Sequence, residues 1–144
     1  MAATTKSALT IEKLIESAKK EDWIYVDSVM PSIAKDRNFL TWARSKGIRD
    51  NNEHVRDLAV SIIEKTEMRP DEFTSLRVPI RLMMIKDSNK YVRFRAAFAL
   101  ANHGPGLFYK EVEKTLIEAK DDKDVSEIAT EYLRNLNSQS QSRS

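Results

Sequence analysis

The 144-residue sequence predicts an all-α fold of about four antiparallel helical hairpins, and three observations support that prediction. The chain contains only 3 Gly and 4 Pro, too few turn-forming residues for a protein of many strands. Apolar residues recur at the three- and four-residue spacing that places them on one face of a helix. A unit of 33 to 37 residues also recurs along the chain, which indicates a stacked helical array, or α-solenoid.

The repeat is clearest in two segments, DNNEHVRDLAVSII at 50–63 and DSNKYVRFRAAFAL at 87–100. Each begins with Asp and places Val-Arg five and six residues later, then Ala and a branched aliphatic residue, at an offset of 37 residues. A third copy, DDKDVSEIATEYL, continues the valine, alanine and aliphatic positions at an offset of 33, with Ser126 in place of the arginine. Because these positions are four residues apart, each copy is predicted to be the second helix of a hairpin.

Eight helices are predicted, in order, at 9–20, 22–34, 36–46, 52–66, 72–86, 89–102, 106–120 and 122–136. The first is amphipathic, and Asp22 is a candidate N-cap of the second. Pro79 lies inside the fifth helix, where it removes a backbone hydrogen bond and bends the axis. The sequence HGPG at 103–106 suits the end of one helix and the start of the next.

Residues 9–136 are predicted to form one domain between a flexible N-terminus at 1–8 and a disordered tail at 137–144, because that tail contains only polar residues. The absence of Cys excludes disulfides and thiolate metal sites. Since no apolar run approaches the roughly 18 residues of a membrane span and no secretory leader is evident, we expect a cytoplasmic protein that does not enter a membrane.

Six positions carry a resemblance to a known family, and in chain order they are Pro79, Asp87, Val92, Arg93, Ala96 and Leu100. Proline in a first helix, aspartate in the turn, then Val-Arg, Ala and Leu in a second helix resembles the short HEAT-like repeat first described around phycobilin lyases. The resemblance covers roughly residues 36–135 and implies a HEAT-like α-solenoid. The lyase activity is not carried over, because no residue of this sequence matches it.

Asp50 and Asp87 precede the two best-matched helices, where a carboxylate can accept hydrogen bonds from free backbone N–H groups. Arg56 and Arg93 lie in the first turns of those helices, and a guanidinium there can reach a carboxylate of the neighbouring repeat. A ligand-binding role for the arginines is the alternative. The sequence favours a structural ladder between repeats, which the family resemblance also implies.

Tyr91, Phe94 and Phe98 occupy positions that are polar in the other two copies, and their spacing places the rings on one helix face. If that face is exposed on the concave side of the solenoid, the rings and the flanking Lys90 and Arg95 form a candidate partner-binding ridge. The alternative is that a neighbouring helix or the chain end covers the rings.

The sequence contains no catalytic or metal-binding motif, so neither an enzyme, a cofactor nor a metal is predicted. The predicted function is a protein-interaction or scaffold module, acting as a monomer through its concave second-helix face. Residues 35–95 carry 14 Lys/Arg and 9 Asp/Glu, which favours an acidic protein partner. The alternative is nucleic-acid binding through Arg37, Arg44, Lys46, Arg49, Arg77, Arg81, Lys86 and Lys90.

Overall fold

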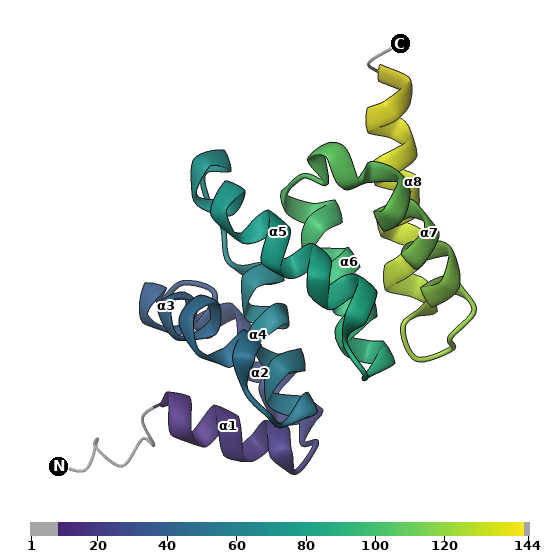
Figure 1. Ribbon diagram of the computed structural model, residues 1–144. Coiled ribbons are helices and arrows are strands. Elements are labelled where there is room, and N and C mark those ends of the chain that lie inside the picture. The colour runs from purple at the N-terminus through teal and green to yellow at the C-terminus, as the bar shows by residue number, and fades with distance from the viewer. Residues whose placement is uncertain (1–8, 143–144) are drawn as a thin grey trace, which may run out of the picture.

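The computed structural model describes the backbone of residues 9–142 and the side chains of residues 9–138, and within that part the chain is all-helical and has no strand (Figure 1). The α-helices are α1 (Ile11–Lys19), α2 (Trp23–Ile33), α3 (Arg37–Ser45), α4 (Glu53–Lys65), α5 (Pro70–Lys86), α6 (Lys90–His103), α7 (Tyr109–Lys120) and α8 (Ser126–Ser142). Two short 3₁₀ turns, η2 (Gly47–Arg49) and η3 (Gly106–Phe108), precede α4 and α7. The all-α prediction and the predicted order of eight helices are therefore confirmed.

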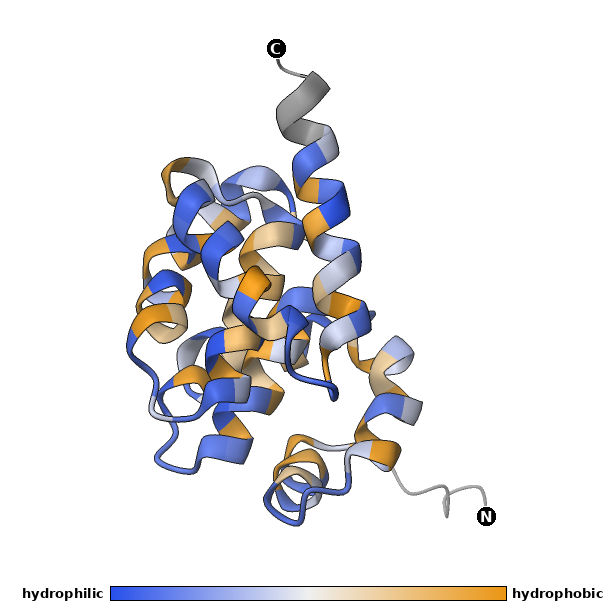
Figure 2. Ribbon diagram, turned by 90° about the vertical axis from the view of Figure 1, so that its right-hand side faces the viewer, coloured by the Kyte–Doolittle hydropathy of each residue, from blue (hydrophilic) through white to orange (hydrophobic). Residues whose placement is uncertain are grey.

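Consecutive helices pack as the pairs α3–α4, α5–α6 and α7–α8, and α6 packs against both α4 and α7. At the N-terminal end α1 packs against α4, whereas α2 contacts α1 and, over a smaller area, α4. The core lies mainly between α4 and α6, whose inward residues have almost no exposed surface. Apolar and hydrophilic residues alternate along the helix turns, as amphipathic helices require (Figure 2).

The three turns that precede α4, α6 and α8 share one hydrogen bond, in which an aspartate accepts the backbone N–H of the second residue after it. The donor–acceptor pairs are Asn52–Asp50, Asn89–Asp87 and Asp124–Asp122, at 2.8, 2.9 and 2.9 Å. The Asn52 and Asn89 side chains then accept backbone N–H groups of the first helical turn. Asp50 and Asp87 therefore fix the turn, and the asparagines, which the sequence prediction missed, are the N-caps.

The connection between α3 and α4 approaches the core so closely that only glycine fits. A Cβ atom at Gly47 would lie 2.6 Å from Cβ of Ala59 on α4 and 2.9 Å from the Trp42 ring on α3. Pro79 lies inside α5, as predicted.

The C-terminal end differs from the prediction, because α8 continues through Ser142 where a disordered tail was predicted from residue 137. Polar composition does not prevent a helix from continuing once its preceding turns are held by packing, and Leu136 is buried in the core. The predicted flexible segment at 1–8 and residues 143–144 lie outside the described residues.

Candidate binding groove

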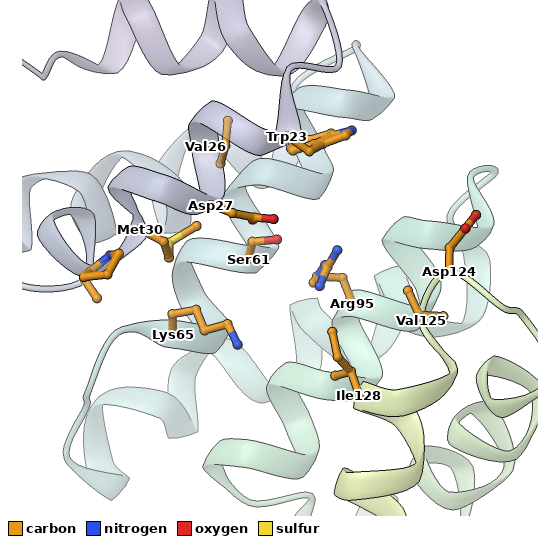
Figure 3. Close-up of a pocket in the computed structure, with 12 residues that line it drawn as sticks. Trp23, Val26, Asp27, Met30, Ser61, Lys65, Arg95, Asp124, Val125 and Ile128 are labelled. Carbon is orange, nitrogen blue, oxygen red and sulfur yellow. The ribbon is translucent and has the colours of Figure 1, made fainter.

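A groove of about 630 Å³ lies between α2 and α8, with α4 and α6 at its base, and we call it the α2–α8 groove (Figure 3). Its lining comes from α2 and its C-terminal end, from α4 and α6, and from α8 and the turn before it. These lining residues are Trp23, Val26, Asp27, Met30, Pro31, Ala34, Ser61, Lys65, Arg95, Asp124, Val125 and Ile128. Every contributing helix is therefore the second helix of a consecutive pair.

A second hollow of about 320 Å³ adjoins the first and shares Trp23, Arg95, Asp124 and Val125 with it. It extends the groove along the N-terminal ends of α4 and α6, where His54 lies with its ring edge toward Trp23, 6.4 Å between centroids. Because the two hollows share four residues, they form one elongated groove.

The sides of the groove carry apolar residues together with one exposed carboxylate each, Asp27 and Asp124, and its base is polar. Trp23, Val26 and Met30 line the α2 side, and Val125 and Ile128 line the α8 side (Figure 3). Trp23 and Ile128 are only partly buried, so apolar surface remains open to water on both sides. Such surface between two helices is typical of a contact site for another molecule.

Arg95 of α6 occupies the base and links it to α4. Its Nε donates to Asp57 Oδ1 at 3.2 Å, and its Nη1 lies 3.9 Å from Glu64 Oε1. Its guanidinium also lies over the Phe98 ring, at 5.7 Å from the centroid. Burial alone would lower the pKa of Arg95, but the Asp57 and Glu64 carboxylates outweigh that effect and the pKa is raised. Arg95 is thus a cation at any physiological pH and lies beside two carboxylates of α4.

Glu64 is completely buried, and its carboxylate contacts one residue of α8 and one of α4. Its Oε2 accepts the Tyr132 hydroxyl of α8 at 2.7 Å and lies 3.4 Å from the Lys65 ammonium group. Burial, together with the negative charge of Glu64, raises the pKa of Tyr132, so its hydroxyl remains a proton donor. Glu64 Oε1 has no hydrogen bond among residues 9–138, and Arg95 supplies its nearest opposite charge.

The predicted aromatic ridge is not an exposed surface. Phe98 has no exposed surface and stacks on Tyr132 at 5.4 Å between centroids, and Phe94 is 8% exposed. The Tyr91 ring meets Phe94 edge-on, and its hydroxyl donates to Asp122 and Asp124. The exposed-ridge interpretation is therefore wrong, because Phe94 and Phe98 are buried and α8 packs against α6, whereas Tyr91 remains partly exposed. The rings are part of the packing between α6 and α8.

The two cations that flank this face are held within the chain as well. The Lys90 ammonium lies 2.9 Å from Asp122 Oδ2 and over the Tyr91 ring, and the Asp122 carboxylate raises the pKa of Lys90. Arg95 is held by Asp57, as described above. Of the five predicted partner-binding residues, only Tyr91 and Arg95 line the groove.

The predicted ladder between repeats contains one complete ion pair. Arg56 of α4 donates from Nε and Nη2 to both oxygens of Asp87, at 2.8 and 3.0 Å, and from Nη1 to the Asp50 carbonyl oxygen. Arg93 repeats only the local bond, from Nη1 to the Asp87 carbonyl oxygen at 2.7 Å. The carboxylate equivalent to Asp87 in the next copy is Asp122, and Lys90 and Tyr91 bind it instead. The structural role of the aspartates and arginines holds, with different partners at the last turn.

Most basic residues proposed for nucleic-acid contact are used inside the chain. Arg37 pairs with Glu72, and Arg44 donates to the Ser75 hydroxyl, so that both connect α3 with α5. Arg81 donates from Nε and Nη2 to Glu111 of α7, each at 2.7 Å. The structure likewise pairs Lys90 with Asp122, and Arg77 and Arg49 donate to backbone carbonyl oxygens.

The α2 side of the groove was not predicted, because the recognised repeat covers roughly residues 36–135 and α2 lies before it. One signal was present in the sequence. The segment WIYVDSVM at 23–30 is more continuously apolar than a helix with one buried face requires. In the structure Ile24 is 87% exposed, and Trp23 and Met30 face the groove.

Comparison with protein-family models, curated proteins and solved structures found no match to this chain. Among the described residues there is no group of three His, Cys, Asp or Glu side chains placed to hold a metal ion. Over the same part of the chain, no helix combines the length and apolar character needed to cross a membrane.

Proposed function

We propose that this chain is a short HEAT-like α-solenoid that acts as a non-catalytic protein-interaction module through the α2–α8 groove. The observation that carries the proposal is a groove with apolar residues on both sides, lined by the second helices and the turns next to them. In a solenoid of helical hairpins the second helices form the concave layer, which these proteins use for binding. The groove replaces the aromatic ridge as the proposed contact surface.

The composition of the groove supports a protein partner. Trp23, Met30 and Ile128 supply aromatic and flexible apolar contacts, of the kind enriched at the centres of protein interfaces. Asp27 and Asp124 supply charged groups around them. This arrangement of an apolar centre and a charged rim is the one expected for a protein-interaction site.

Nucleic-acid binding is the weaker proposal, because the arginines of α3 and α5 that would contact phosphates are engaged by Glu72, Ser75 and Glu111. They also belong to helices that do not line the groove. A gel-shift titration in about 50 mM salt checks this ranking, since phosphate contacts are strongest at low salt. Tight binding under those conditions, lost on raising the salt, would reverse the ranking.

The interaction proposal is tested by one groove substitution and one matched control. Ile128→Ser removes an apolar side chain from the groove, and Ile117→Ser makes the same change on the outer surface of α7, where Ile117 is 51% exposed. In affinity capture from an extract of the cells that produce the protein, we expect Ile128→Ser to lose partners that the wild type and Ile117→Ser retain. Circular dichroism establishes that both variants are folded. Equal capture by all three proteins would reject the groove as the contact surface.

A further inference from the structure

The groove has a negative charge, although the middle of the chain is basic. Its two hollows are lined by four carboxylates and two cations, which gives a formal charge of −2 with histidine counted as neutral. The carboxylates are Glu21, Asp27, Asp57 and Asp124, and the cations are Lys65 and Arg95. The expectation of an acidic partner came from the 14 Lys/Arg of residues 35–95, of which only Lys65 and Arg95 line the groove.

Both cations already have anionic neighbours within the base. Arg95 donates to Asp57 and lies close to Glu64, and the Lys65 ammonium lies 3.4 Å from Glu64 Oε2. Neither cation therefore presents an uncompensated positive charge to a ligand. Glu64 is buried behind the lining, and it adds a further negative charge beneath the base.

Of the three exposed carboxylates of the groove, Glu21 lies 3.6 Å from the His54 ring, whereas Asp27 and Asp124 form no ion pair with a Lys or Arg among residues 9–138. Asp27 on the α2 side is exposed and forms no ion pair within this part of the chain, although its negative charge contributes to the raised pKa of Arg95 at the base. Asp124, in the turn before α8, accepts the neutral Tyr91 hydroxyl. The two aspartates lie on opposite sides of the base residue Arg95 (Figure 3). A ligand that brings positive charge to both sides would meet complementary charge at each.

We propose that the occupant of the α2–α8 groove is a basic amphipathic helix of a partner protein, an inference that rests on the proposed interaction function. The groove lies between two helices and has apolar residues on both sides, which is the setting in which the apolar face of a partner helix is bound. The apolar face of that helix packs between Trp23 and Ile128, and its Lys or Arg side chains reach Asp27 and Asp124. An acidic helix would instead bring like charges to both carboxylates.

The proposal is tested with a random library of displayed 16-residue peptides, selected for binding to the full chain and then screened against Ile128→Ser. We expect the selected peptides to carry apolar residues at helical spacing and an excess of Lys and Arg over Asp and Glu. Their binding should fall at least about tenfold with Ile128→Ser, since about 1.4 kcal/mol of lost contact corresponds to that factor.

A second pair of variants tests the charges separately from the shape. Asp27→Asn with Asp124→Asn removes the two charges without changing side-chain size, and the amide oxygen that replaces the Asp124 carboxylate can still accept the Tyr91 hydroxyl, so the fold is retained. The matched control is Glu118→Gln with Asp121→Asn, two exposed carboxylates outside the groove. Measured by fluorescence anisotropy in about 50 mM salt, we expect a selected peptide to bind about tenfold more weakly to the groove pair, and less than about twofold more weakly to the control pair.

The outcomes separate the two proposals. Peptides that require Ile128 but are acidic, or that bind the groove pair as tightly as the wild type, would overturn the basic helix and leave the interaction function standing. Selection that yields no peptide, or only peptides insensitive to Ile128→Ser, would overturn both. A difference between the groove pair and the control pair that persists undiminished in about 500 mM salt would also reject charge attraction as its cause.

Discussion

The corresponding faces of α4 and α6 come from two copies of the same sequence unit, yet one is the base of a groove and the other is largely covered. On α4 the positions are His54, Asp57 and Ser61, and all three line the groove or its extension. On α6 the equivalent positions are Tyr91, Phe94 and Phe98: Tyr91 lines the extension, Phe94 is buried, and Phe98 stacks on Tyr132 of α8. The polar residues of α4 therefore face the groove, and the apolar rings of α6 face mainly other side chains.

The difference originates in the neighbouring helices. The helix α8 packs against α6, so Phe98 meets Tyr132, whereas α2 contacts α4 only over a small area and leaves the groove open. The repeat thus produces two similar helices, α4 and α6. The outer face of each helix is apolar or polar according to whether another helix packs on it. In this chain, two of the three aromatic residues that interrupt the polar column, Phe94 and Phe98, mark a covered face.

The largest effect is expected from truncating the covered face. Phe98→Ala should lower the free energy of unfolding by about 4 kcal/mol, because it leaves a cavity where a fully buried ring stacks on Tyr132. Ser61→Ala, at the equivalent position of α4, should change it by less than about 1 kcal/mol. Urea unfolding followed by circular dichroism measures both. Similar losses for the two variants would show that the two faces are covered alike.

The next effect concerns the charged connection between the two helices. Arg95→Met should cost about 3 kcal/mol, since it leaves Asp57 and the buried Glu64 without their shared cation. Adding Glu64→Gln to Arg95→Met should recover part of that loss, because one buried charge is then removed. If the double variant is less stable than Arg95→Met, the carboxylate is stabilised by groups other than Arg95.

A smaller effect separates the two arginines of the ladder. Arg56→Met breaks two hydrogen bonds to Asp87, whose side chain is 6% exposed, and should cost about 2 kcal/mol. Arg93→Met breaks a hydrogen bond to a backbone carbonyl oxygen and should cost less than about 1 kcal/mol. Thermal melts of the two variants at one pH provide the comparison. Equal losses would mean that Arg93 has gained an ion pair in solution.

The smallest expected effect is a pH dependence at the last turn. The hydrogen bond from Lys90, assisted by the backbone N–H of Asp124, lowers the pKa of Asp122. A lowered native pKa contributes stability that is complete above the unfolded value, about pH 4, and is lost as the pH falls through the native value. The difference in melting temperature between wild type and Asp122→Asn should therefore be larger at about pH 7 than at about pH 2.5.

Asp121→Asn, one residue away and exposed, is the control for that measurement. A pH-dependent difference of the same size for Asp121→Asn would show that the effect is not specific to Asp122. A constant difference for Asp122→Asn as well would show that its contacts in the turn do not depend on its charge.

The sequence predicts the helices well because each signal is local. Apolar spacing and the Asp-x-Asn turns determine where α4 and α6 begin, and these turns recur in the structure as hydrogen bonds. The groove could not be predicted in the same way, since its sides come from Trp23 and Ile128, residues 105 positions apart in the chain. Whether Phe98 is exposed also depends on the packing of a different helix, and no spacing rule within α6 contains that information.

The hydroxyl of Tyr132 on α8 reaches Glu64 on α4, although the pair α5–α6 stands between those two pairs in chain order. In a simple array each unit touches only its immediate neighbours, so the ends can detach one by one. Here, removing α7 and α8 would remove the Tyr132 hydroxyl that donates to the buried Glu64 of α4. It would also expose Phe98 of α6. The chain should accordingly melt in a single cooperative step, and shortened versions that end after α6 should not persist as folded units.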